Sequence, residues 1–146
     1  MVRHFIIIFL CSIICLVFIF NNVFADSKAQ QWERASKTMV RALKTDNDGL
    51  KISVLHNIIR YGDKLDVGDA VFDIMRIYRN HKDERVRQLA LIALHKIEND
   101  WAMNFLKRAL KFENSPILRK RIYAILFDYY QQQGEVESLF ALSMKK

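Results

Sequence analysis

The stretch DERVRQLALIALHKI, residues 83–97, has the periodicity of a helix. Apolar or small residues recur in it every three or four positions, which places them on one helix face. They are Val86, Leu89, Ala90, Ala93, Leu94 and Ile97. Leu91 and Ile92 fall outside this stripe. Apolar residues on a second face predict that neighbouring elements cover the helix on more than one side.

The same pattern occurs three times along the chain. Val86, Arg87, Ala90 and Leu94 align with Leu118, Arg119, Ile122 and Leu126 at a shift of 32 residues, and with Leu50, Lys51, Val54 and Ile58 at a shift of 36. The helices that precede these three repeat with nearly the same shifts. Ala70, Ile74, Ile77 and Tyr78 align with Ala102, Leu106, Ala109 and Leu110 at a shift of 32, and with Ala35, Met39, Ala42 and Leu43 at a shift of 35. Two helix types that alternate in register indicate a stack of helical pairs.

Polar residues mark the expected helix starts. Asn47, Asp83 and Ser115 each lie three residues before the apolar start of a second helix, where their side chains can cap free backbone amides. Asp66 and Asp100 are expected to cap the first helices of the second and third pairs. The predicted helices cover about 28–45, 49–61, 67–80, 84–98, 101–112 and 116–132.

The middle stretch resembles the second helix of a HEAT-like repeat. The residues that carry the resemblance are Asp83, Val86, Arg87, Ala90, Ala93 and Leu94. The resemblance extends from Gln30 to about Gln133. HEAT and armadillo repeats usually span about 40 to 47 residues, which is longer than the shifts of 32 and 36 residues in this chain. The chain is therefore more similar to short bacterial HEAT-like repeats, such as those related to phycobilin lyases. The resemblance implies an all-α, right-handed α-α superhelix of about three pairs, at 28–61, 67–98 and 101–132, followed by a capping helix at 135–144.

In HEAT-like arrays an Asp in the turn and an Arg in the second helix form a ladder between adjacent repeats. By this resemblance Asp83 and Arg87 match both positions of the ladder. Ser115 with Arg119 keeps only the cation. An exposed rung of this kind contributes about 0 to 1 kcal/mol, so its expected use is to set the register of the pairs.

Residues 1–25 have the composition of a secretory signal peptide. MVRH precedes an unbroken apolar or small run from Phe5 to Phe20, and Val23 and Ala25 supply the small-residue pair that a signal peptidase needs. Cleavage after Ala25 would leave residues 26–146 as an exported domain, periplasmic or secreted. The alternative is an uncleaved membrane anchor with the domain facing outward, because the apolar segment approaches the about 20 residues that cross a bilayer.

The exported part has no cysteine, because Cys11 and Cys15 both lie in the leader. It therefore contains no disulfide, thiolate metal site or cysteine nucleophile. Without Arg3 it carries 22 Lys and Arg against 16 Asp and Glu, a net charge of +6. Opposite charges are interspersed, which favours an ordinary solvated helical surface. A basic surface also suits an acidic partner or peripheral contact with anionic lipid, whereas export disfavours nucleic acid.

The sequence contains no constellation typical of an enzyme, a cofactor or a metal site. His4, His56, His81 and His95 lack the spacing of metal ligands. Asp69 and Asp73 share a helix face, but negative charge near a helix start is favoured by the helix dipole alone. No nucleophile, phosphate loop or oxyanion donor set accompanies them, so we expect a non-catalytic protein.

The last predicted helix carries the candidate binding surface. Leu118, Ile122, Ile125, Leu126 and Tyr129 form its core face, and Arg119, Tyr123, Phe127 and Tyr130 lie on an adjacent face. Either the tail at 135–144 covers that second face, or a partner binds there, because Tyr and Arg are common at interface hot spots. The expected function is an exported scaffold that binds a protein or peptide. The alternative is a membrane-associated structural protein held by its uncleaved N-terminal helix.

Overall fold

The computed structural model describes residues 28–134, and every regular element in that range is helical, as the sequence predicts. The predicted signal peptide at 1–25 and the predicted cap at 135–144 lie outside the described residues. In chain order the elements are a helix over 28–43, α2 (Asp48–Tyr61), the 3-10 turns η1 (Gly62–Lys64) and η2 (Gly68–Ala70), α3 (Val71–Asn80), α4 (Glu84–Ile97), α5 (Asp100–Ala109) and α6 (Pro116–Gln133). None of the helices described is both long and apolar enough to cross a bilayer.

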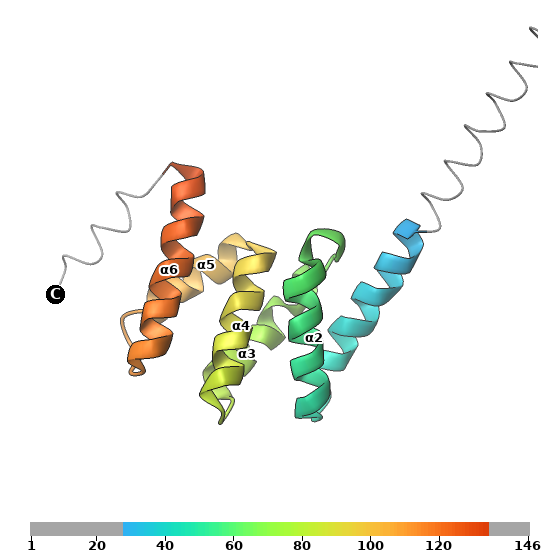
Figure 1. The fold of residues 1–146 in the computed structure, drawn as a ribbon, viewed down its shortest axis with the longest axis horizontal. Coiled ribbons are helices and arrows are strands. Elements are labelled where there is room, and N and C mark those ends of the chain that lie inside the picture. Colours follow the sequence, from blue (N-terminus) through green and yellow to red (C-terminus); the bar gives the residue numbers. More distant parts are fainter. Residues whose placement is uncertain (1–27, 135–146) are drawn as a thin grey trace, which may run out of the picture.

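The helices form two layers. In Figure 1, α2, α4 and α6 stand side by side in one row, and α3 and α5 lie behind them. The central helix, α4, contacts α2 on one side and α6 on the other, and it also packs on α3 and α5. Leu91, which lies off the main apolar stripe of α4, is fully buried as a result. The prediction that this helix is covered on more than one side is confirmed.

The aligned positions of the three second helices contribute to one hydrophobic core. The buried members are Val54, Ile58, Val86, Ala90, Leu94, Leu118, Ile122 and Leu126. Leu50, in the first turn of α2, is the exception at 41% exposed. At these aligned positions periodicity therefore predicts the buried residues of α4 and α6, and those of α2 beyond its first turn, whereas Leu89 and Ile97 of the α4 stripe are only half-buried.

The side-chain caps of the second helices form as predicted. The Asn47 side chain accepts a hydrogen bond from Leu50 N at 3.0 Å, and that of Ser115 accepts one from Leu118 N at 3.2 Å. The Asp83 side chain also caps α4, but it accepts from Arg85 N, two residues later instead of three. Helix α6 ends at Gly134 in the left-handed conformation that glycine favours, with φ at 74°.

The caps predicted for the first helices are wrong. Asn99, not Asp100, has extended backbone before α5, and its side chain accepts from Ala102 N at 3.1 Å. Asp100 lies in the first turn and accepts a hydrogen bond from Tyr129 Oη at 2.6 Å. Asp66 precedes a 3-10 turn rather than an α-helix, and α3 begins without a side-chain cap.

Helix α5 is shorter than predicted. It ends at Ala109, and the next residues form tighter turns, with Phe112 N donating to Ala109 O at 2.9 Å. Pro116 and its cap Ser115 then start α6. The loop between α5 and α6 is consequently longer than the turn between α3 and α4.

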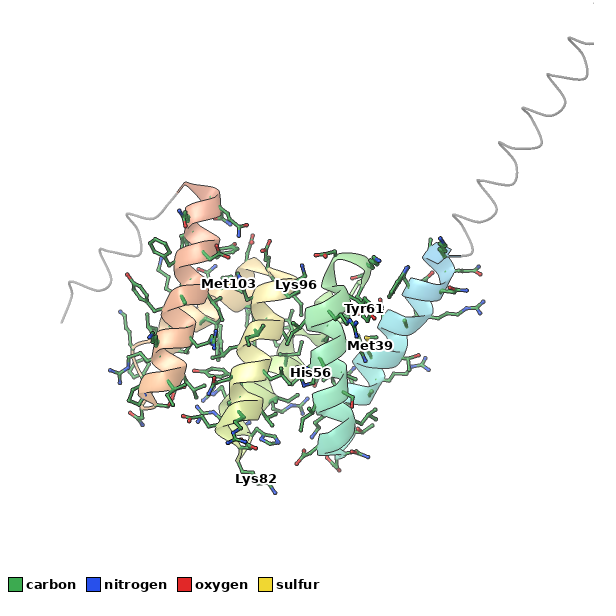
Figure 2. The ribbon with its side chains drawn as sticks, viewed as in Figure 1. Met39, His56, Tyr61, Lys82, Lys96 and Met103 are labelled. Atoms are coloured by element: carbon green, nitrogen blue, oxygen red, sulfur yellow. The ribbon has the colours of Figure 1, made fainter. Side chains whose placement is uncertain are left out.

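The helix over 28–43 is attached to the rest through a buried serine. Ser36 Oγ accepts from Asp66 N at 3.0 Å and donates to Trp32 O at 2.8 Å. The Trp32 and Tyr61 rings lie 5.6 Å apart. Figure 2 shows Tyr61 and Met39 at the junction of this helix with α2, where both pack against the core.

Candidate partner-binding groove

A buried carboxylate joins the second and third helical pairs. Glu113, in the α5–α6 loop, accepts hydrogen bonds from Tyr78 Oη at 2.7 Å and from Arg87 Nη2 at 3.0 Å. Its other oxygen accepts from Ser115 N at 3.0 Å. Arg87 Nε donates to Tyr78 O at 2.8 Å, so one side chain of α4 holds the end of α3 and the α5–α6 loop together.

Arg87 thus reaches the neighbouring pair, but through Glu113 rather than through an aspartate of the ladder. Asp83 caps its own helix by accepting from Arg85 N at 2.8 Å. Ser115, at the position aligned with Asp83, donates a hydrogen bond to Glu84 of the preceding pair. Sequence alignment of the repeats missed Glu113 because, at the shift of 32 residues, it aligns with His81, which is not an acid.

The network favours a charged Glu113 and a neutral Tyr78. Desolvation is the largest influence on the Glu113 pKa and raises it, but the hydrogen bonds of Tyr78 and Ser115 and the charge of Arg87 together bring this pKa below its ordinary value. Burial, and then the hydrogen bond to Glu113, raise the pKa of the Tyr78 phenol. The phenol is therefore a donor at any physiological pH, and the carboxylate an acceptor.

The Glu113 network predicts a loss of stability in acid. Because folding lowers the pKa of this group, its contribution is complete above about pH 4.5, the ordinary value, and is lost as the pH falls through the lower folded pKa. Urea unfolding of the wild type and Glu113→Gln between pH 7 and pH 3 measures this. The difference in free energy of unfolding between the two proteins should shrink below about pH 4.5. A difference that stays constant down to pH 3 would contradict the assignment.

An open groove lies over this network, between the end of α3 and the α5–α6 loop. It has a volume of about 690 Å³. Three arginines, Arg79, Arg87 and Arg108, line it against one glutamate, Glu113, so the lining carries a net charge of +2. Figure 2 places Lys82, in the α3–α4 turn, at this edge of the molecule and Lys96 at the opposite edge.

An aromatic row runs from α3 across α5 into the groove. The Phe72 and Trp101 ring centroids are 4.5 Å apart, and Trp101 stacks on Phe105 at 6.4 Å with an interplanar angle of 9°. Phe105 meets Tyr78 edge to face at 6.2 Å and lines the groove. Phe72 is 64% exposed and Trp101 46%, and Phe112 at the groove is 81% exposed. The aromatic row, defined as Phe72, Trp101 and Phe105, is thus continuous with the groove.

The residues predicted as the binding surface of α6 have different environments. Tyr130 is buried, because α5 covers it: Lys107 Nζ lies 4.7 Å from the ring centroid. Tyr123 and Phe127 are half-buried against the core. Arg119 donates to Glu113 O through Nε at 3.1 Å and Nη2 at 2.7 Å, which supports the loop. Arg119 and Tyr123 do share a shallow apolar hollow of about 400 Å³.

Sequence reasoning missed the aromatic row, although a signal for it exists. On α3, Phe72, Arg76 and Arg79 are spaced i, i+4 and i+7, and on α5, Trp101, Phe105 and Arg108 have the same spacing. Such residues share a helix face, which here adjoins the core-facing stripe. The repeat alignment uses only the core-facing residues, so it does not include this second stripe.

Several of the acidic and histidine side chains lie in pairs. Asp73 is buried and pairs with Arg76, whereas Asp69 is exposed. His95 Nε2 lies 3.0 Å from the Asp128 carboxylate, and His81 Nε2 lies 3.6 Å from that of Asp48. In the span 28–134 no three His, Asp or Glu side chains gather in a way that could hold a metal ion.

Comparison with protein-family models, with curated proteins and with solved structures finds no match for this chain.

Proposed function

We propose that this chain is an exported, non-catalytic HEAT-like scaffold that binds another protein through the aromatic row of α3 and α5. The observation that carries the proposal is the exposure of large aromatic side chains in one continuous row, with Phe72 at 64% and Trp101 at 46%. Clustered exposed apolar surface is uncommon on monomeric proteins and is typical of interaction sites.

The chemistry of the row favours a protein partner. Aromatic residues and arginine are the side chains most enriched at interface hot spots. The Trp101 ring lies between the tilted ring of Phe72 and the parallel ring of Phe105, so it is already ordered and little side-chain entropy remains to be lost on binding. The row lies on α3 and α5, one of two packed helix layers that together provide a rigid support (Figure 1).

The HEAT-like part of the proposal includes a right-handed superhelix of pairs at 28–61, 67–98 and 101–132. It is supported by the alternation of the two helix types, by the burial of most aligned apolar positions in the second and third pairs, and by Arg87, which links adjacent pairs. Export rests on the composition of residues 1–25.

Site-specific photo-crosslinking in the native host tests the binding surface. A photoreactive phenylalanine analogue replaces Phe72 in the aromatic row, Tyr123 on α6 or, as a control, Lys37 on the exposed side of the helix over 28–43. We expect a discrete protein adduct from position 72 and none from position 37. Circular dichroism of each purified variant checks that it folds.

The remaining outcomes reject the surface or the function. A protein adduct from position 123 alone would move the site to α6. A lipid adduct from position 72 would favour a membrane-associated structural protein. Equal adducts from all three positions would indicate contact without a defined site.

A further inference from the structure

We infer that the groove beside the aromatic row accepts acidic side chains, so the partner presents a segment in which apolar residues are followed by Asp or Glu. This inference rests on the proposed function, because it assumes that the row binds a protein. It adds the chemical class of the segment and the residues that select it, Arg79 and Arg108.

Within residues 28–134, the charge of the groove is only partly neutralised. Glu113 forms an ion pair with Arg87 at 3.0 Å. Arg79 and Arg108 also line the groove, and both are exposed. Among residues 28–134, no carboxylate forms an ion pair with either of them. Two guanidinium groups are therefore available to bind anions that approach from outside.

The floor of the groove directs anions to these two arginines. The Tyr78 hydroxyl already donates to Glu113, and Arg87 already donates to Glu113 and to Tyr78 O. Glu113 itself repels a second carboxylate from the deepest part. An acidic side chain is thus expected nearer the groove mouth, where a planar guanidinium can hold both carboxylate oxygens.

Apolar walls strengthen this attraction. Phe105 and Phe112 line the groove together with the two arginines. Aromatic walls exclude water from a bound ion pair and so reduce screening of its attraction. Phe112 is largely exposed, and a bound segment would cover its ring.

The size and position of the groove favour a peptide segment. A volume of about 690 Å³ accommodates a few side chains but not a folded domain. Phe105 belongs both to the groove and to the aromatic row, so one chain can contact both. Apolar side chains would cover Phe72 and Trp101, and acidic side chains would follow at Arg108 and Arg79.

Selection from a library of random 12-residue peptides displayed on phage tests this inference with the full exported chain as bait. We expect enriched peptides to combine aromatic or aliphatic residues with two or more Asp or Glu. One enriched peptide and its copy with Asn and Gln in place of Asp and Glu are then synthesised with a fluorescent label. Fluorescence anisotropy measures their dissociation constants for the wild type and for variants.

The double variant Arg79→Gln/Arg108→Gln should bind the acidic peptide about tenfold more weakly, because two partly exposed charge pairs are lost. Arg34→Gln/Arg41→Gln removes the same charge from exposed positions of the helix over 28–43, and we expect it to bind as the wild type does. The Asn/Gln peptide should bind the wild type as weakly as the acidic peptide binds the double groove variant. Raising the salt concentration should weaken the binding of the acidic peptide more than the binding of its neutral copy.

The outcomes separate this inference from the proposed function. Enriched peptides that lack an acidic bias, and whose binding is lost in Trp101→Ala but kept in the groove variant, would overturn the inference and leave the proposed function standing. No enrichment at all would count against both. Binding to vesicles with 30% phosphatidylglycerol, lost in the groove variant and without peptide enrichment, would assign the groove to lipid and overturn the inference.

Discussion

Replacing Leu91 by alanine should lower the free energy of unfolding by about 3 to 4 kcal/mol, the usual cost of a cavity in a tightly packed core. Leu91 is fully buried in α4, the helix that contacts both of its neighbours in the row. Both flanking helices depend on this packing, so the whole domain is expected to unfold in one transition at a lower urea concentration, with an unchanged slope.

A matched control comes from the repeat itself. Leu50 occupies the position in α2 that aligns with Val86 in α4, but it is 41% exposed. Leu50→Ala should cost about 1 kcal/mol or less, because neighbours and water fill the space it leaves. Equal losses for Leu91→Ala and Leu50→Ala in urea unfolding would contradict the central position of α4.

Replacing Glu113 by alanine should cost about 3 kcal/mol, because it breaks a buried ion pair and leaves its partners in place. The Glu113 side chain is 6% exposed, and that of Arg87 is 24% exposed. Without the carboxylate, Arg87 loses its ion pair but keeps its hydrogen bond to Tyr78 O, and the Tyr78 hydroxyl loses its acceptor. Urea unfolding at pH 7 measures the loss.

Two comparisons show whether the loss comes from these unpaired groups. Glu33→Ala removes an exposed carboxylate paired with Lys37 and should leave the unfolding midpoint unchanged. Adding Arg87→Met and Tyr78→Phe to Glu113→Ala should recover much of the stability, because Met and Phe leave no buried charge or hydroxyl that needs the carboxylate as a partner. A triple variant less stable than Glu113→Ala would show that Arg87 and Tyr78 act mainly through other contacts.

Much of the fold could be predicted from the sequence because helix periodicity and capping are local. The three-and-four spacing around Ala90 predicts α4, and Asn47, Asp83 and Ser115 predict where second helices start. The starts of the first helices are less predictable, because two 3-10 turns precede α3 and because Asn99, not the expected Asp100, caps α5.

The candidate site could not be predicted in the same way, because it depends on which helix covers which face. Tyr123 and Tyr130 lie on one side of α6, but α5 buries Tyr130. Glu113 looks like an ordinary loop residue until folding places it beside Tyr78, 35 positions earlier in the chain. The aromatic row needs α3 and α5 to be adjacent, since Phe72 and Trp101 belong to different pairs.

The intrinsic fluorescence of Trp101 tests most directly whether the aromatic row and the groove are one binding surface. The chain has two tryptophans, and Trp32→Phe leaves Trp101 as the reporter. Saturation of this variant with the selected acidic peptide, made without tryptophan, should shift the emission to shorter wavelength as the exposed ring loses water. The same peptide concentration should give a much smaller shift when Arg79→Gln and Arg108→Gln are added. Unchanged Trp101 emission at peptide saturation would contradict the account.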